Sequence, residues 1–386
     1  MVDWRGARDR AATWLEQWDA SGIHRTATAG DAAGAQWLAG AAEALGAVPT
    51  IETFAVERLD PIASHLEFDG MRIDGVPVFD APATTAAGIS GKLGMLGSRS
   101  TIGVSIASPQ TVYSGEYEAL RRTAEHDALV LVCDGARPGL ALLNAERFRT
   151  PYGAPAIQVP SEAHEAIRAG VERGVEARLV TAARRLRAPA ENVVVTIPGH
   201  APRQTPIVVM TPRSSWWQST AERGGGLVCW LETLRALLAM PPAPDVVLTA
   251  NTGHELGHLG LDDFLARRLG WERPVAAGGA LWVHYGANLG AAQGELSLLS
   301  ADPELAALAA EALGHAGHPP VRMAPPSQVP SGETRDIHRA GGRYLTLVGS
   351  NPWFHHPDDR WPHSVEVSAV ARIAAAAAAT VLRLTR

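Results

Sequence analysis

The stretch that most constrains the fold of this chain is Asp245–Gly260, DVVLTANTGHELGHLG. An apolar run leads through small and polar residues to His254 and Glu255, and the helix-like sequence LDDFLARRLG follows. Short apolar runs with a helix behind them are typical of buried strands in parallel sheets. In open α/β sheets, ligands bind where such strands end. The stretch therefore predicts an α/β protein with its chemistry at His254 and Glu255.

The same residues also match the HExxH pattern, in which two imidazoles one helical turn apart bind zinc. That pattern requires a continuous helix through His254 and His258. The residues before His254 read as a strand, and Gly257 and Gly260 are poor helix formers. We therefore expect a chance match, or a supporting role for His258, in preference to a zincin site.

Strands and helices alternate along the rest of the chain. Helical periodicity is found at 5–20, 30–45, 226–240 and 302–314, and strand-like runs at 51–59, 191–199, 205–211, 278–286 and 343–349. This alternation predicts an α/β fold with a mostly parallel mixed sheet sandwiched by helices.

The texture of the sequence changes between residues 64 and 186. Short strand-like pieces and frequent turn residues replace the longer elements, and no cluster of His, Asp or Glu at ligand spacing is found. We expect an inserted, smaller β-rich domain at 64–186 with a structural or lid role. Residues 1–63 and 187–386 would then form the catalytic α/β domain.

Composition restricts the partners of the protein. With 386 residues and 46% hydrophobic content, the chain can bury a sizeable core. Its net charge of −6 gives no basic surplus for nucleic acid or an anionic membrane. Two cysteines and an N-terminus without an apolar signal segment suggest a cytoplasmic protein. We expect a small-molecule or short peptide substrate and no nucleic-acid or membrane partner; the oligomeric state stays open.

Four motifs follow one another in an order that resembles a known family: ENVVVTIPG at 191–199, ERGGG at 222–226, the pair His254-Glu255, and HHPDD at 355–359. The order resembles that of the zinc aminopeptidases and glutaminyl cyclases of the clan MH metallopeptidases, over nearly the whole chain. The insertion resembles the protease-associated domain of many members. The resemblance implies their α/β fold and a metal-dependent enzyme.

The resemblance also implies a ligand set. Glu222 matches the family's bridging acid, Glu255 its second-metal acid and His355 its loop histidine, whereas Pro212 and Ala287 stand where first-metal ligands are expected. We therefore expect one divalent metal, zinc by preference, held by the three retained residues. Two acids and one histidine with an open position also suit a catalytic metal on chemical grounds.

Each expected ligand has an alternative interpretation. Glu222 could be an exposed acid at a helix N-terminus, stabilised by the helix dipole. Glu255 could form a buried salt bridge, and His356 could replace His355 as the ligand.

His254 matches a glutamate that serves the family as general base. An imidazole has an ordinary pKa near 6.5 and can accept a proton at neutral pH. We expect His254 to take the proton of a metal-bound water. A further ligand, a donor to a developing oxyanion and a structural histidine are the alternatives.

Substrate contacts are expected from residues that refill the lost metal position and from neighbouring loops. Arg213 can clamp a carboxylate through two hydrogen bonds, and Asp359 could orient a ligand or bind substrate. Solvated arginines and packed tryptophans are the alternative. The full set of expected substrate-binding residues is Arg213, Trp216, Trp217, Arg335 and Asp359.

Together these features predict a mononuclear metal-dependent hydrolase of an amide-type bond in a small, carboxylate-bearing substrate. The first alternative keeps the metal but not hydrolysis, as in glutaminyl cyclase-like cyclisation or in a lyase or isomerase. The second is a catalytically inactive, aminopeptidase-like binding protein, and the third is the zincin site.

Overall fold

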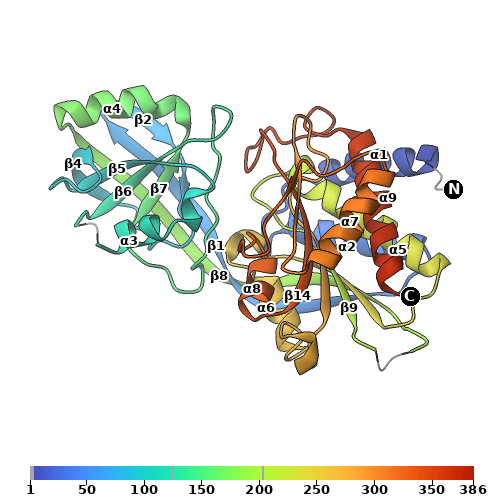
Figure 1. Cartoon of the computed structure of the whole chain (residues 1–386). Helices are drawn as coiled ribbons and strands as arrows, with labels where there is room; N and C mark the ends of the chain where they lie inside the picture. Colours follow the sequence, from blue (N-terminus) through green and yellow to red (C-terminus); the bar gives the residue numbers. More distant parts are fainter. Residues whose placement is uncertain (1–3, 124, 202–203) are drawn as a thin grey trace.

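Two bodies of the protein share one pair of long strands (Figure 1). The computed structural model describes residues 4–123, 125–201 and 204–386. Strands β1 (Pro49–Phe68) and β8 (Glu176–Ile197) pair antiparallel, from Pro49 opposite Val195 to Phe68 opposite Ala177. They run from the helix-flanked main body into the smaller body, so the two bodies are joined by continuous sheet.

The main body is built on a mixed sheet with the strand order β13-β12-β14-β11-β9-β10-β8. Strands β14, β11, β9 and β10 run parallel, while β8 is antiparallel to β10 and β12 is antiparallel to β14 and parallel to β13. This arrangement confirms the fold class predicted from the sequence. The strand bounds are β9 Ile207–Pro212, β10 Val246–Asn251, β11 Leu281–Tyr285, β12 Leu296–Leu299, β13 Arg322–Met323 and β14 Arg343–Gly349.

Helices cover both faces of this sheet because alternate strand residues point to opposite sides. On one side Val209 packs with α1, α2, α5, α7 and α9; on the other, Val208 and Met210 pack with α6 and α8. The helix bounds are α1 Trp4–Ala20, α2 Ala29–Ala44, α5 Gly225–Ala239, α6 Leu259–Ala266, α7 Pro303–His315, α8 Thr334–Arg339 and α9 Val367–Leu384.

Helix α9 is long and apolar enough to cross a membrane by length and composition alone. Of its residues, 56% are buried inside the protein, where it packs against α5, α7 and α1. This packing is that of a terminal helix on the core of the main body.

The smaller body continues the sheet beyond β8 in the order β4-β5-β6-β7-β3. Leu93, Val104, Val130 and Ile157 contribute to its own apolar core. The domain limits expected after residues 63 and 186 fall inside β1 and β8, so no linker lies there. The element bounds are β2 Met71–Asp74, β3 Val76–Pro77, β4 Ile89–Met95, β5 Ile102–Ala107, α3 Gly115–Thr123, β6 Ala128–Cys133, β7 Ala156–Val159 and α4 His164–Arg173.

The predicted helices at 5–20, 30–45, 226–240 and 302–314 are confirmed as α1, α2, α5 and α7. Strand β1 is longer than the run predicted at 51–59. The predicted run ends just before Asp60 and Pro61. In the structure the strand continues through them, with a break of register between Pro61 and Ala63.

Candidate active site

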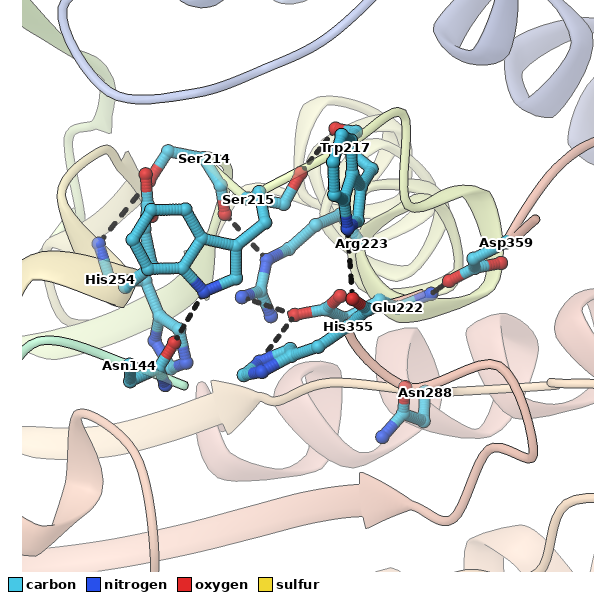
Figure 2. A network of polar contacts seen from close by, with 12 residues as sticks. Asn144, Ser214, Ser215, Trp217, Glu222, Arg223, His254, Asn288, His355 and Asp359 are labelled. Atoms are coloured by element: carbon cyan, nitrogen blue, oxygen red, sulfur yellow. Dashed lines mark hydrogen bonds and ion pairs between the residues drawn. The ribbon is translucent and has the colours of Figure 1, made fainter. Parts of the chain in front are cut away.

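Buried polar residues, among them Glu255 and His355 expected from the sequence, gather at the carboxyl ends of parallel strands. Ser214 follows β9, Glu255 follows β10 and His355 follows β14. Glu222 enters from a single turn of π-helix, Thr220–Gly224, that leads into α5. All four side chains are buried, and several converge in Figure 2. The strand ends therefore hold ionisable groups inside the protein.

Two glycines shape the loop that follows β10. Gly253 (φ 76°) and Gly257 (φ 77°) adopt the left-handed backbone region, which glycine enters at little steric cost. They flank one turn of 3₁₀-helix, His254–Leu256, and His258 is itself left-handed at φ 62°. No continuous helix carries both histidines, as expected. The turn nevertheless brings their ring centroids to 5.3 Å.

Glu222, Arg223 and His355 form a buried group that we call the Glu222 cluster (Figure 2). Nη2 of Arg223 lies 2.7 Å from Oε1 of Glu222, and Nε2 of His355 lies 3.4 Å from the same oxygen. Burial by itself would raise the pKa of Glu222, but the charges of Arg223 and His355 lower it to about 2. A permanent cation of the protein therefore compensates the Glu222 carboxylate.

Asp359 supports this cluster through the backbone of the π-helical turn. Its carboxylate accepts hydrogen bonds from the N–H groups of Ala221 (2.8 Å) and Glu222 (2.9 Å), and Asn351 Nδ2 donates at 3.2 Å. Burial raises the pKa of Asp359 to about 7 against the effect of these backbone donors. Its contacts position the turn that carries Glu222.

The Glu255 carboxylate accepts hydrogen bonds from Thr26, in the N-terminal part of the chain, and from Ser214. Thr26 donates to Oε1 from its hydroxyl (2.5 Å) and its backbone N–H (3.0 Å), and the Ser214 hydroxyl donates to Oε2 at 2.6 Å. Ser214 Oγ accepts the N–H of Gly253 at 2.7 Å. Both carboxylate oxygens thus tie the loop after β10 to its neighbours, and no contact among the described residues joins Glu255 to Glu222 or His355.

Arg213, expected to clamp a substrate carboxylate, lies in the interior with no exposed surface. Its Nη1 lies 2.9 Å from Oδ1 of Asp31 in α2, and its Nη2 donates to the carbonyl of Glu191 at 2.7 Å. The guanidinium charge therefore fastens α2 to the sheet.

The two expected tryptophans contact different partners. Trp216, 2% exposed, packs on Phe79 of the smaller body with ring centroids 4.7 Å apart, and its Nε1 donates to Asn144 at 3.2 Å. Trp217 donates from Nε1 to the carbonyl of His355 at 2.9 Å. Trp216 thus joins the two bodies, and Trp217 holds the loop that carries His355.

A second buried group, which we call the His254 cluster, consists of His254, His258, His284 and Glu333. Nδ1 of His254 lies 2.8 Å from Oε1 of Glu333, and Nε2 of His284 lies 3.5 Å from Oε2. Beside the cluster, Nδ1 of His258 lies 2.7 Å from Oδ2 of Asp336. Exposure is 6% for His254, 2% for His258 and His284 and 1% for Glu333. Three imidazoles thus surround one carboxylate.

Burial and charge act in opposite directions on the pKa values of this group. Burial lowers the pKa of His254, although Glu333 opposes it. For His258 burial acts in the same sense, but the hydrogen bond to Asp336 and the charge of Glu333 outweigh it and raise the pKa. Burial alone would raise the pKa of Glu333, whereas the histidine contacts hold it well below its usual range. Glu333 is therefore an ionised carboxylate in the interior.

The two clusters are electrostatic neighbours. The charge of His254 also lowers the pKa of Glu222, and the charge of Arg223 lowers the pKa of His254. Ser214 also links them, since its carbonyl accepts from Nε of Arg223 at 2.7 Å and its hydroxyl oxygen accepts from the N–H of His254 at 3.2 Å. Both clusters therefore lie at one site.

A loop of the smaller body, residues 138–148, contacts both sides of this site. Nδ1 of His355 donates to the carbonyl of Leu142 at 2.5 Å, so Nε2 is the atom that faces Glu222. The N–H of Ala145 donates to the carbonyl of Glu255 at 2.8 Å. A β-carbon at Gly139 would collide with Nε2 of His356, so only glycine fits there. The smaller body thus completes the wall of the site.

Two cavities border the His254 cluster. The larger, about 860 Å³, lies between the two bodies and is lined in part by His258, Arg335 and Asp336. The smaller, about 330 Å³, is lined in part by His254 and His284. Arg335, expected to contact substrate, lines the larger cavity and pairs with Glu146 of the smaller body at 2.6 Å. The cluster therefore has space for a substrate beside it.

Comparisons with known proteins agree with this architecture. BSAP, a zinc aminopeptidase from Bacillus subtilis, superposes with a TM-score of 0.77 at 16% identity over 98% of this chain and 95% of its own. An aminopeptidase from Aneurinibacillus sp. strain AM-1 gives 0.72 at 12% identity, covering 98% and 94%. A peptidase M28 precursor from Shewanella amazonensis gives 0.74 at 14% identity, covering 99% and 96%.

The fold is that of the zinc aminopeptidases. No protein-family profile matches the sequence, and no curated protein matches it. At these levels of identity the likeness concerns the zinc aminopeptidase fold, so the chemistry must be judged from the residues of this chain.

Two sets of buried side chains are candidate metal ligands in this zinc aminopeptidase fold. Of the set expected from sequence, Glu222 and His355 lie 3.4 Å apart, while Glu255 accepts hydrogen bonds from Thr26 and Ser214 and Arg223 pairs with Glu222. In the part of the chain that the structure describes, one ligand atom each from His254, His258 and Glu333 lie within 4.8 Å of one another. This second set fits a metal ion.

Sequence reasoning missed Glu333, His284, Asp336 and Arg223 as members of the site. Glu333 and Asp336 lie on either side of Arg335 in the GETRD segment, but only Arg335 was predicted as a site residue from that segment. The available signal was the pair of acids beside a segment expected to face the cleft. His284 lies in the wholly buried strand β11, where a polar residue needs a partner.

Proposed function

We propose that this chain is a metal-dependent hydrolase of an amide-type bond in a small, carboxylate-bearing substrate. One observation carries the proposal: buried imidazoles and carboxylates gather at the carboxyl ends of parallel strands, beside cavities, in a fold whose solved examples include zinc aminopeptidases. Titratable groups in such clefts are candidates for catalysis because burial and charge shift their pKa values.

A carboxylate-bearing substrate is supported by the charges of the larger cavity. Arg147, Arg149, Arg335 and Arg339 line it. The first three pair with Glu118, Asp262 and Glu146. No ion pair of Arg339 is found within residues 4–123, 125–201 and 204–386, and its exposed guanidinium can bind a carboxylate through two hydrogen bonds. Arg339 thus takes the role expected of Arg213.

The residues of the site divide the chemistry between them. A divalent ion, when bound at this site, lowers the pKa of water and polarises a carbonyl group. We assign the exchange of a proton with the reacting atoms to one of two imidazoles: His254, the base predicted from the sequence, or His355. The Leu142 carbonyl fixes the proton of His355 on Nδ1, so its Nε2 can accept another. Glu222, 3.4 Å away, stabilises the imidazolium that results.

The test is hydrolysis by protein purified without chelators and supplied in turn with zinc, manganese and cobalt. The substrates are N-acyl amino acids, amino acid anilides and dipeptides, with products identified by mass spectrometry. We expect turnover of at least one amide class, lost on chelation and restored by metal. His315→Ala is the control, because that side chain is 78% exposed and lies on α7. No turnover of any class with any metal contradicts the proposal.

Reaction in oxygen-18 water separates hydrolysis from cyclisation or a lyase reaction. A hydrolase must place one solvent oxygen in the product, whereas an intramolecular cyclisation places none. Label in the product supports hydrolysis, and an unlabelled product identifies a non-hydrolytic metal enzyme.

An inactive binding protein is the second candidate, and the Arg223–Glu222 pair favours it. A guanidinium at 2.7 Å compensates an acid that would otherwise be available to an ion. In that case the protein would bind N-acyl amino acids, measured by calorimetry, without converting them.

A further inference from the structure

We propose that a divalent transition-metal ion binds between His254, His258 and Glu333, away from Glu222 and Glu255. The proposal rests on the metal dependence proposed above and specifies where the ion lies. It concerns the described side chains alone and can be tested without substrate.

The donor set has the chemistry of a catalytic metal site. Two imidazoles and one carboxylate offer ligand atoms that all lie within 4.8 Å of one another, and none of the three residues is more than 6% exposed. Two nitrogens and one oxygen, with a position left open, are typical of catalytic zinc. Exposed acids often cluster without an ion, but this set is buried and mixed in type.

Several atoms of the His254 cluster lack a hydrogen bond. Nδ1 of His254, both carboxylate oxygens of Glu333 and Nε2 of His284 are buried without a hydrogen-bond partner among the described residues. His254 and Glu333 approach to 2.8 Å, yet their alignment is not that of a hydrogen bond. Buried polar atoms in folded proteins are almost always paired. An ion between these atoms would satisfy them.

A second layer of contacts orients the ligands. Nδ1–H of His258 donates to Asp336 at 2.7 Å, which leaves Nε2 of His258 free for an ion. His284 faces Glu333 through Nε2 and is held at Nδ1 by Thr334, 3.3 Å away. Metal-binding histidines almost always give their other nitrogen to a carboxylate, a carbonyl or a water. Asp336 and His284 are therefore positioning residues.

The Glu222 cluster does not offer the same environment. The guanidinium of Arg223 contacts Glu222 at 2.7 Å and would repel a dication there. Glu255 gives both oxygens to Thr26 and Ser214. Both oxygens of Glu222 and Nε2 of His355 also lack a hydrogen-bond partner among the described residues, so the two clusters differ in charge. A guanidinium pairs with the Glu222 carboxylate, whereas the contacts of the Glu333 carboxylate are with imidazoles.

The cavities give an ion at this position access to substrate. His258 and Asp336 line the larger cavity, and His254 and His284 line the smaller one.

The experiment measures metal binding to the full-length protein. Metal-free protein is titrated with Zn²⁺ in competition with a chromophoric chelator, and the visible spectrum of the Co²⁺-loaded protein is recorded. We expect one equivalent in the wild type. His258→Ala and Glu333→Gln should weaken Zn²⁺ binding by more than about a hundredfold, and Asp336→Asn by about 10–100-fold. Each should change or abolish the Co²⁺ spectrum.

Glu222→Gln and His355→Ala are the matched controls, since they alter the neighbouring cluster. Both should keep one equivalent of Zn²⁺ and the wild-type Co²⁺ spectrum. The proposal is overturned if the wild type binds no ion, if His258→Ala binds as the wild type does, or if the controls lose the ion while His258→Ala keeps it.

The variants distinguish loss of the metal site from misfolding and from failure of the proposed hydrolysis. Asp336 is 36% exposed, so Asp336→Asn tests the site even where a substitution in the buried cluster prevents folding. An ion lost from His258→Ala and kept in His355→Ala supports the site even if no amide is hydrolysed, which would remove only the proposed function. Turnover by the wild type with no ion at this position would remove only the site.

Discussion

The ion pair between Glu222 and Arg223 should dominate the stability of the main body around the site. The charged atoms lie 2.7 Å apart and neither side chain is exposed. The pKa of Glu222 falls from an ordinary 4.5 to about 2. Arg223, His355 and His254 together cause this shift, which at 1.36 kcal/mol for each pH unit corresponds to about 3 kcal/mol at neutral pH for the three charges together. Removing one partner of a buried pair typically costs about 3–5 kcal/mol, so the two values agree in order of magnitude.

We expect Glu222→Gln and Arg223→Met each to lower the free energy of unfolding by about 3–5 kcal/mol, because each leaves a buried charge unpaired. The double variant leaves none, so its loss should be well below the sum of the two single losses. The exposed pair Glu165–Arg168, also at 2.7 Å, is the matched control, and Arg168→Met should cost less than about 1 kcal/mol.

Urea unfolding followed by circular dichroism and tryptophan fluorescence measures these differences, from the midpoint and slope of each transition. The reasoning is refuted if the double variant loses the sum of the single losses. It is also refuted if the buried variants cost no more than Arg168→Met, since the pair would then behave as a solvated one.

Three further predictions concern stability. Burial, helped by the charge of Arg213, lowers the pKa of His24 to about 3. The folded protein therefore keeps this ring neutral down to about pH 3, whereas the unfolded chain protonates it below about pH 6.5. Stability should fall by up to about 1.4 kcal/mol per pH unit as the pH drops from 6.5 towards 3; melting temperatures against pH should show a shallower slope for His24→Gln. Thr26→Val removes a donor to Glu255 and an acceptor for Gly253, and should cost about 1–3 kcal/mol in urea unfolding; an unchanged midpoint would contradict it. Asp302→Ala removes the N-cap of α7 and should cost about 1–2 kcal/mol, with protection of the first turn of α7 against hydrogen exchange reduced; unaltered exchange there would argue against the capping role.

The fold was accessible from the sequence because its signals are local. Apolar runs followed by helical periodicity define β10 with α6 and β9 with α5, and these units fix a parallel sheet with helices on both faces. The placement of His254 and Glu255 at a strand end follows from the same pattern.

The contacts of the site were less accessible because they depend on partners distant in sequence. Glu255 accepts a hydrogen bond from Thr26, 229 residues away in the sequence, and Arg213 donates one to Asp31, 182 residues away. The left-handed residues Gly253, Gly257 and His258 decide which way the side chains of the loop point. A strand-end position shows that a residue reaches the site, but not which neighbour it meets.

The shared strands β1 and β8 hold the smaller body in place beside the candidate site. The loop 138–148 meets the main body at His355, Glu255 and Trp216, through Leu142, Ala145 and Asn144. These three hydrogen bonds connect the smaller body directly to the candidate site. Deleting the smaller body would therefore remove the Leu142 carbonyl that orients the His355 ring, as well as one wall of the larger cavity.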